Sequence, residues 1–376
     1  FWVARMIIAG YEFVGDKPFN NVYFTGIVRD NIGRKMSKQF GNSPDPLDLI
    51  AKYGADGVRM GLMLAAPAGN DVFYDDKLVE QGRNFCNKIW NAFRLVKGWS
   101  VADIAQPDSA RIAVDWFKSQ LDTTLAEVSD LFGKFRLSEA LMAIYRLFWD
   151  EFSSWYLEMV KPAYGEPMDK ATYEATLGYF DTLLRLLHPF MPFITEELWQ
   201  HLQERNPGDS IMYAQLPEPA AVDSKTLDAM VHAKEVIVGV RGVRAAKNIS
   251  PRDTLVLNVI GEWDDALDAV VKKLGNLSEI NSGVEKDAAA ATFMVGTTEF
   301  NVPLTNNIDV EAELARLNKD LDYYRGFLAS VMKKLGNERF VNNAPEAVVA
   351  AERNKQKDAE SKIATIEASI KALEGK

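Results

Sequence analysis

The sequence has little cysteine and little histidine: Cys86 is its one cysteine, and only three histidines are scattered through 376 residues. A single cysteine excludes an internal disulfide framework. Structural zinc sites take four cysteine or histidine ligands, so this shortage argues against one. We expect Cys86 to act as a small buried apolar residue rather than as a reactive thiol.

Long apolar runs are also missing. No stretch approaches the roughly 18 uncharged apolar residues of a membrane-spanning helix, and Phe1 to Met6 lack the layout of a signal peptide. These absences predict a soluble, cytoplasmic protein with no membrane partner. Because the chain starts inside what reads as an apolar element, we expect it to be the C-terminal part of something longer.

An excess of positive charge is absent as well, since the net charge is -10. Such a chain does not attract nucleic acid over its whole surface, so any such binding must come from local patches. The 47% apolar and 26% charged residues are sufficient for buried cores. At roughly 150 residues per domain, the length predicts two to four domains.

Near the N-terminus, a short run of β-branched and aromatic residues precedes a basic loop. Residues 22–28, VYFTGIV, predict a strand. The strand leads into Gly33–Asn42, GRKMSKQFGN, and strand ends are where open α/β sheets place ligand sites. A helix is predicted from Pro46, because Asp45 and Asp48 favour a helix N-terminus.

Beyond this region the sequence changes texture twice before the last segment. From about residue 75 to 205 an apolar period near 3.6 predicts a bundle of four or five helices. The connector LPEP at 216–219 follows. From 236 to about 304, apolar alternation with Pro, Asn and Asp breaks predicts a small α+β domain.

The last seventy residues, approximately, carry a heptad spacing of apolar residues from Val310 to Leu335 and again from Ala359 to Leu373. Gly336 and Asn337 break the first helix. The pattern predicts an antiparallel coiled-coil hairpin with arms about 40 Å long. A dimeric coiled coil made from one of these helices is the alternative, and the matching lengths of the two halves favour the hairpin.

The basic loop places Arg34, Lys35 and Lys38 between two glycines that allow it to open and close. Two ammonium groups on such a loop can meet the charge that develops on a departing pyrophosphate. One well-placed donor of this kind is worth about 3 to 4 kcal/mol. The alternative is a solvated basic turn, and the letters KMSK alone do not decide between the two.

The sequence around the loop carries a family resemblance. The loop and residues 45–59 resemble the KMSKS loop and stem-contact region of class I aminoacyl-tRNA synthetases. Residues 187–199, LHPFMPFITEELW, resemble the signature of their helical anticodon-binding domain. The terminal hairpin, together with residues 1–6 and 81–92, is similar to the valyl members of that class. The resemblance covers the whole chain.

Together, the patterns and the resemblance predict a mostly α, multidomain fold with five parts. These are the end of a Rossmann-like α/β catalytic domain (1–45), a stem-contact region (46–74), a helical anticodon-binding domain (75–215), a small α+β domain (216–306) and an antiparallel coiled-coil arm (307–376). The resemblance implies a monomeric enzyme that activates valine with ATP and Mg²⁺ and transfers it to tRNA(Val).

The resemblance also implies roles for residues of the loop. Lys35 and Lys38 stabilise the pyrophosphate that leaves as the valine carboxylate attacks the α-phosphate of ATP. Ser37 lies beside them, and Met36 lies close to the adenine, so Lys35–Lys38 form the predicted ATP contact. Trp2 matches a tryptophan that lines the amino-acid pocket in this subgroup; the alternative is a core tryptophan.

Two departures from the family pattern stand out. Gln39 replaces the usual serine at the end of the motif, which leaves both lysines in place. No two of the three histidines stand three residues apart, so the HIGH-type motif that grips ATP is missing. We therefore expect the ATP-gripping half and the editing domain to lie upstream of Phe1. The chain alone is predicted to be inactive.

A polar row is predicted to read the anticodon. The segment 81–96 has an apolar stripe and, opposite it, a row without carboxylates: Arg83, Asn87, Asn91 and Arg94. Amides and guanidiniums can bond to unstacked base edges, where RNA is mainly read. The alternative is a solvated polar face. The aromatic cluster at 148–156 fits a bundle core better than a stacking surface.

Basic residues gather near the bend of the hairpin, although the hairpin as a whole carries no net charge. They are Lys333, Lys334, Arg339 and Arg353. A basic end on a stiff lever suits the outer corner of a tRNA, where shape and phosphates matter most. A second basic row, Arg241, Arg244 and Lys247, has either a phosphate contact or plain solvation as its role.

Two rival interpretations remain at this point. One is an isoleucyl or leucyl relative, which shares the loop and the bundle. The other is a non-catalytic RNA-binding or coiled-coil protein that has lost the chemistry.

Overall fold

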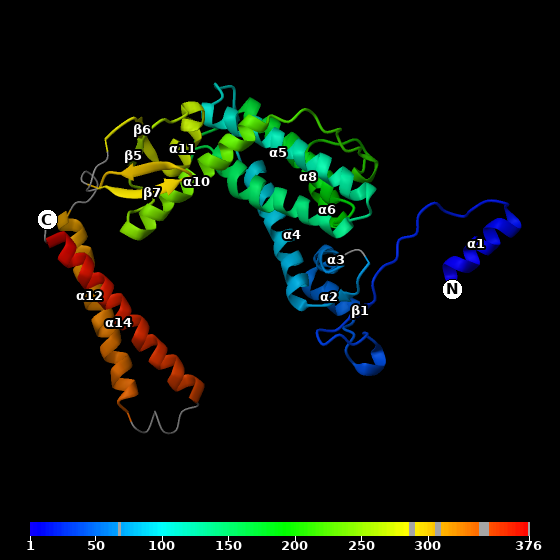
Figure 1. Cartoon of the computed structure of the whole chain (residues 1–376), viewed down its shortest axis with the longest axis horizontal. Helices are drawn as coiled ribbons and strands as arrows, with labels where there is room; N and C mark the ends of the chain where they lie inside the picture. Colours follow the sequence, from blue (N-terminus) through cyan, green and yellow to red (C-terminus); the bar gives the residue numbers. More distant parts are fainter. Residues whose placement is uncertain (67–68, 286–289, 305–309, 338–345, 375–376) are drawn as a thin grey trace. The chain divides into compact units, whose positions relative to one another are not determined.

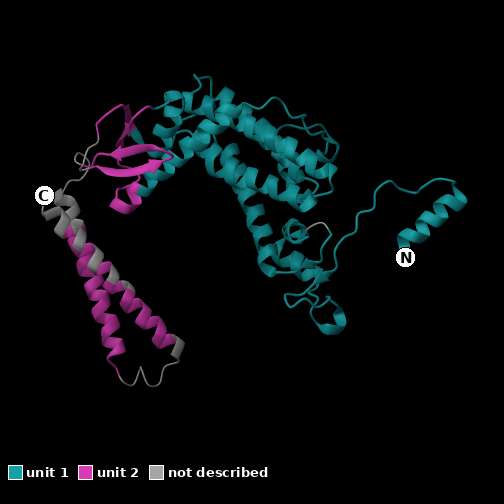
Figure 2. Ribbon diagram, viewed as in Figure 1, with its two compact units in different colours: residues 1–242, 263–277 teal, residues 243–262, 278–376 magenta. Residues whose placement is uncertain are grey.

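The protein is described by a computed structural model covering residues 1–66, 69–285, 290–304, 310–337 and 346–374. It divides into two compact units: residues 1–242 with 263–277, and residues 243–262 with 278–376 (Figure 2). In the described ranges, no helix has the length and apolar character needed to cross a membrane.

The first unit begins with helix α1 (Trp2–Phe13) and a minimal parallel sheet. Strand β1 (Val28–Arg29) pairs with β2 (Val72–Phe73). The strand predicted over 22–28 is therefore wrong for residues 22–27. The cause is the partner: β2 is only two residues long, and the Ile27 amide donates to the Asp71 carboxylate at 3.0 Å instead of extending a ladder.

Three helices after the basic loop pack into one block. Helix α2 (Pro46–Tyr53) starts as predicted, with the Asp45 side chain accepting from the Leu47 amide at 2.8 Å. Helix α3 (Ala55–Leu64) packs against α4 (Asp76–Lys97). Gly57 and Gly61 let the two backbones meet, because a Cβ on Gly61 would lie 2.7 Å from the Val79 backbone.

The block continues into the helical bundle drawn from cyan to green in Figure 1. Its helices are α4, α5 (Asp108–Gly133), α6 (Leu137–Arg146), the π-helical segment η2 (Leu147–Tyr156), α7 (Leu157–Val160), α8 (Lys170–Leu187) and α9 (Pro192–Leu202). Strands β3 (Val101–Ala102) and β4 (Met168–Asp169) pair in parallel beside them. Because α6, η2 and α7 follow one another without a break, they count as one long helix, and the bundle has five helices in the described residues. The predicted bundle of four or five helices is therefore confirmed.

Aromatic side chains fill the centre of the bundle. Phe148, Phe152 and Tyr156 are fully buried, and Phe152 packs edge-on against Phe180 of α8 with ring centroids 5.5 Å apart. The interpretation of this cluster as core is confirmed. Cys86 of α4 is half-buried, and burial raises the pKa of its thiol to about 12, which suits a packing residue.

Helix α10 (Ser224–Lys247) leads toward the β-rich part of the chain. The β-rich region predicted from residue 236 therefore begins later than expected. Val236, Val240 and Val243 are buried at helical spacing, so the apolar run belongs to a helix rather than to a strand. The unit boundary falls within this helix, after residue 242.

A four-stranded sheet forms the core of the second unit. Strands β5 (Leu255–Ile260), β6 (Leu277–Ser282), β7 (Ala291–Val295) and β8 (Thr298–Val302) lie in the order β6-β5-β8-β7. The β5–β8 and β8–β7 pairs are antiparallel. Between β5 and β6 the chain forms α11 (Asp268–Gly275), which belongs to the first unit and packs on α5 and α7.

Two long helices end the described chain, α12 (Val310–Leu335) and α14 (Glu346–Glu374), and they pack side by side (Figure 1). Arg325 Nη2 lies 2.7 Å from Glu367 Oε1, and Lys334 Nζ lies 3.8 Å from Glu352 Oε1. Arg325 precedes Lys334 on α12, whereas its partner Glu367 follows Glu352 on α14, so the two helices run in opposite directions. Interlocked coiled-coil packing between them stays a prediction.

Candidate functional site

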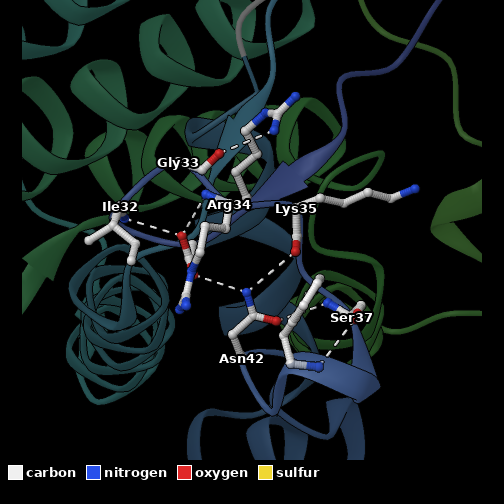
Figure 3. A network of polar contacts seen from close by, with 9 residues as sticks. Ile32, Gly33, Arg34, Lys35, Ser37 and Asn42 are labelled. Atoms are coloured by element: carbon white, nitrogen blue, oxygen red, sulfur yellow. Dashed lines mark hydrogen bonds and ion pairs between the residues drawn. The ribbon is translucent and has the colours of Figure 1, made fainter.

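Asp30 organises the basic loop. Its carboxylate accepts hydrogen bonds from the Arg34 amide and Arg34 Nε, both at 2.8 Å, from Asn42 Nδ2 at 2.9 Å and from the Ile32 amide at 3.2 Å (Figure 3). The hydrogen bond from Asn42, helped by Arg34, lowers the pKa of Asp30 to about 2. Asp30 is thus a charged anchor for the loop at neutral pH.

Asn42 closes the loop from its other end. Its Oδ1 accepts the Ser37 amide at 2.9 Å, while its Nδ2 donates to Asp30 and, at 3.4 Å, to the Lys35 carbonyl. One amide side chain therefore ties together the start, middle and end of the loop. The amide oxygen accepts and the amide nitrogen donates, so neither a shorter nor a charged side chain reproduces the pattern.

Ser37 starts a single turn of 3₁₀ helix, η1 (Lys38–Phe40). Its hydroxyl accepts the Phe40 amide at 3.3 Å, and Gly41 ends the turn with φ 64°, a left-handed conformation that suits glycine. The geometry gives Ser37 a role in shaping the loop. Contact with a nucleotide stays a prediction for Met36 and Ser37.

Lys35 and Lys38 are left free by this scaffold. Both side chains are exposed, and in the part of the chain that the structure describes neither forms an ion pair. Figure 3 shows the Lys35 side chain pointing away from Asn42. The loop therefore fixes its own backbone with Asp30 and Asn42 and presents two unneutralised ammonium groups.

A second anchor fastens the loop to strand β2. Arg29 Nε forms an ion pair with Asp71, and Arg29 Nη1 donates to the Gly33 carbonyl at 3.1 Å. The hydrogen bond from Arg29 lowers the pKa of Asp71. The first glycine of the loop is thus held by Arg29 of β1, whose side chain is itself held by Asp71, the residue before β2.

A cavity of about 610 Å³ lies between the loop and the start of α4. Met36, Asn42 and Asp30 line it from the loop, and Tyr74 and Asp75 line it from the other side. The Tyr74 hydroxyl donates to Asp76 at 2.6 Å, and burial raises the pKa of Tyr74, so it stays protonated. The loop has open space beneath it.

Helix α3 grips the turn between α8 and α9. Asp56 accepts the Ile194 amide at 2.6 Å and the Phe193 amide at 3.4 Å, which caps α9 from another helix. Arg59 Nε donates to the Phe190 carbonyl at 3.0 Å, and Nη2 donates to the Pro189 carbonyl at 3.2 Å. The block that carries the basic loop is therefore clamped to the helical bundle.

The predicted polar row of α4 lies at the surface. All four of its members are exposed, while Phe85, Ile89 and Val96 on the opposite side are buried. The row comprises Arg83, Asn87, Asn91 and Arg94. The amphipathic assignment is confirmed. Reading of the anticodon by these residues stays a prediction.

The second basic row does not form one surface. Arg244 is only 7% exposed, and its Nη1 donates to the Ser250 carbonyl at 2.9 Å. Arg241 lies over the Trp155 ring at 5.6 Å from the centroid. Arg244 is occupied by the fold, which argues against a phosphate contact there.

The remaining predicted site residues are only partly described. Lys333, Lys334 and Arg353 are exposed on α12 and α14, with Lys334 facing Glu352. Arg339 lies outside the described residues. Trp2 is 72% exposed, and the Arg5 guanidinium lies 4.8 Å from its ring centroid, so its pocket role stays a prediction.

The residues that hold the site in place do not stand out in the sequence. Asp30, Asn42 and Asp71 fix the loop, and Asp56 with Arg59 fix the bundle. The stretch Asp30–Gly33 carries a turn signal, an Asp followed three residues later by Gly, and this signal predicts the Asp30 contacts within the turn. The contacts of Asp71 and Asp56 join residues more than forty positions apart, and no local pattern points to them.

Three family models match separate parts of the chain. The class I tRNA synthetase model for the I, L, M and V types matches residues 1–75, the anticodon-binding domain of tRNA ligase matches 115–260, and the valyl tRNA synthetase tRNA-binding arm matches 309–374. The three matches follow one another in the order expected from the sequence.

Curated relatives agree with these matches. A valine–tRNA ligase of Parabacteroides distasonis is 67% identical over 99% of this chain, and one of Phocaeicola vulgatus is 65% identical over 99%. One from Fusobacterium nucleatum is 38% identical over 100% of the chain. The chain spans about 43% of the length of the first two relatives.

Among solved structures, the crystal structure of a LeuRS–tRNA–LeuAMS ternary complex from Agrobacterium radiobacter K84 matches 59% of this chain and 27% of its own. The TM-score is 0.42, and the sequence identity is 23%.

Proposed function

Because the chain belongs to the valine–tRNA ligases of the class I tRNA synthetase family, we propose that it supplies three working parts of an enzyme that joins valine to tRNA(Val) with ATP. These parts are the KMSKS-type loop, the anticodon-binding bundle and the tRNA-binding arm. The valyl type of the arm model and the valine–tRNA ligase relatives favour this function over that of an isoleucyl or leucyl enzyme.

The observation that carries the proposal is the state of Lys35 and Lys38 in their loop. Asp30 and Asn42 fix the backbone while both ammonium groups stay exposed and unpaired within the described residues. When the valine carboxylate attacks the α-phosphate of ATP, negative charge gathers on the leaving pyrophosphate. Preorganised cations stabilise that charge without having to reorganise.

The other loop residues position rather than react. Met36 lines the cavity beneath the loop and is proposed to lie against the adenine, and Ser37 holds the turn that carries Lys38. Mg²⁺ enters with ATP as part of the substrate. In the described ranges, no group of three His, Cys, Asp or Glu side chains is placed to hold it. Trp2 is proposed as a wall of the valine pocket.

The polar row of α4 is proposed to read the anticodon. Arg83 and Arg94 are eleven positions apart, about 16 Å along the helix axis, which is long enough to follow several splayed bases. The amides of Asn87 and Asn91 both donate and accept, so they can discriminate between base edges. Since no carboxylate interrupts the row, the phosphates meet only neutral or positive groups.

The arm is proposed to be a coiled-coil hairpin that touches tRNA phosphates through Lys333, Lys334, Arg339 and Arg353. The ion pairs from Arg325 to Glu367 and from Lys334 to Glu352 are consistent with antiparallel packing. We further propose that the enzyme is a monomer, because each unit of the chain encloses its own core. A cytoplasmic location is proposed from the similarity to valine–tRNA ligases, which act in translation.

Binding of this chain to tRNA(Val) tests the proposal. Fluorescence-detected affinity is measured at two salt concentrations, beside the same tRNA with the last anticodon base changed from C to U. Valine codons begin GU and isoleucine codons AU, so this base separates the two. We expect affinity to fall by about fivefold or more, since a mismatched base contact costs at least about 1 kcal/mol. Equal, salt-sensitive binding to both tRNAs leaves only a phosphate-gripping module and contradicts the α4 assignment.

A further inference from the structure

A recess lies on one side of the α12–α14 pair. Its volume is about 290 Å³, at the lower end of the range of ligand pockets. Three aromatic rings come from α12, and two lysines with one small residue come from α14. They are Tyr323, Tyr324, Phe327, Lys355, Ala359 and Lys362. No carboxylate is among these residues.

Two of the three aromatic side chains of the recess, Tyr323 and Phe327, do not pack in the seam between the helices, whereas Tyr324 is partly buried. Leu321 and Val331 fill that seam and are 6% and 3% exposed, whereas Tyr323 is 66% exposed and Phe327 is 38% exposed. The Tyr323 and Tyr324 rings meet edge to face, with centroids 5.3 Å apart. Two large rings thus stand in solvent on a helix pair whose own core does not need them.

The lysines of the recess add positive charge at its rim. Lys362 Nζ lies 5.0 Å from the Tyr324 ring centroid and 3.5 Å from its hydroxyl. Lys355 Nζ is held at 2.8 Å by Glu352, one turn earlier on α14. Glu352 offsets part of the charge of Lys355, so Lys362 supplies most of the positive charge at the rim.

Flat apolar faces beside fixed cations match the chemistry of a nucleotide. We propose that this recess binds one unstacked nucleobase of the tRNA, which stacks on Tyr323 and Phe327, while Lys355 and Lys362 contact the adjoining phosphates. Stacking of this kind tolerates any base, because every base has a π-face. The inference rests on the proposed function and adds a stacking site to an arm otherwise described by its basic end.

The test measures the affinity of this chain and its variants for tRNA(Val) across a range of salt concentrations. Tyr323→Ala and Phe327→Ala remove the rings, and Tyr323→Trp keeps a ring. Tyr213→Ala is the matched control, because Tyr213 is 74% exposed and lies in the other unit. All three positions are surface positions, so folding is preserved, and circular dichroism checks it.

We expect Tyr323→Ala and Phe327→Ala each to weaken binding about tenfold without changing its salt dependence, since stacking releases no counterions. Tyr323→Trp and Tyr213→Ala keep the affinity of the wild type. Lys362→Gln lowers the slope of log affinity against log salt by about one, the mark of one lost phosphate contact.

Three outcomes overturn the inference. If the wild-type chain binds but Tyr323→Ala and Phe327→Ala bind equally well, the stacking site is wrong and the proposed function stands. If the wild-type chain does not bind tRNA(Val), the proposed function fails and the inference fails with it. If Tyr323→Ala instead converts a dimer to a monomer in sedimentation, the recess is an interface between two copies of the chain.

Discussion

At the level of single residues, one acidic and one neutral side chain fix the backbone of the loop and leave its two lysines exposed and unpaired within the described residues. An acidic side chain that neutralised Lys35 or Lys38 would stabilise the loop and remove the charge that the proposed reaction needs. The Asp30 carboxylate accepts hydrogen bonds from Arg34, from backbone amides and from Asn42, so it does not pair with either lysine. The side chains that fix the loop are therefore not the ones that are proposed to meet the pyrophosphate.

Replacement of Asn42 tests this arrangement through the ionisation of Asp30. A carboxylate whose folded pKa is lowered stabilises the fold above its unfolded pKa, about 3.9, and that contribution is lost as the pH falls through the folded value of about 2. We expect Asn42→Ala to raise the pKa of Asp30 toward its ordinary value, because the largest cause of the shift disappears. Carbon-detected NMR titration of the Asp30 carboxyl measures it.

Asn31→Ala is the matched control, since Asn31 is an exposed neighbour on the rim of the same cavity. It should leave the titration of Asp30 unchanged. An Asp30 pKa that stays near 2 in Asn42→Ala shows that Arg34 alone holds the carboxylate and that Asn42 does not brace the loop.

At the scale of elements, the contact between α3 and α4 decides how the loop block meets the bundle. Gly61 stands where the two backbones touch, and a methyl group there forces them apart. Overpacking of this kind costs about 1 to 3 kcal/mol. We therefore expect Gly61→Ala to lower the urea midpoint of the first unit.

Gly178 gives the matched control for this substitution. It lies inside α8, and no atom stands within 4 Å of the place that an alanine methyl group would take. Gly178→Ala should therefore gain roughly 0.5 to 1 kcal/mol from helix propensity. Urea unfolding followed by circular dichroism compares the two variants. Equal midpoints contradict the close packing of α3 on α4.

The elements also show where sequence reasoning succeeds and where it stops. The helix that starts at Pro46 and the amphipathic face of α4 follow from local capping and periodicity, and both are present. The strand predicted over 22–27 is absent because a strand extends only as far as it can pair with a neighbour, and β2 pairs over two residues. The apolar residues from Val236 onward are compatible with either a strand or a helix. The structure shows a helix, with its valines buried at helical spacing.

At the level of the whole chain, the order of the parts could be predicted from the sequence, but the contacts that hold them together could not. The basic loop, the bundle signature and the heptads each have a local pattern. The hydrogen bonds from Asp56 and Arg59 to the region between α8 and the first turn of α9 join residues at least 130 positions apart, and only the fold brings them together. They link the loop block to the bundle proposed to read the anticodon, so the two working parts of the first unit are held by direct hydrogen bonds.

If the basic loop takes part in adenylate formation as proposed, valine-dependent exchange between ATP and pyrophosphate measures its contribution directly. The enzyme for this measurement is the Parabacteroides distasonis relative with its matching segment replaced by this chain. Its wild-type form is compared with Lys38→Ala and with Gln39→Ala, an uncharged change at the next position. We expect Lys38→Ala to slow exchange by about 10² to 10³, the scale of one lost transition-state donor, with little change in valine affinity, and Gln39→Ala to keep the rate. Unchanged exchange in Lys38→Ala would contradict the assignment of the loop.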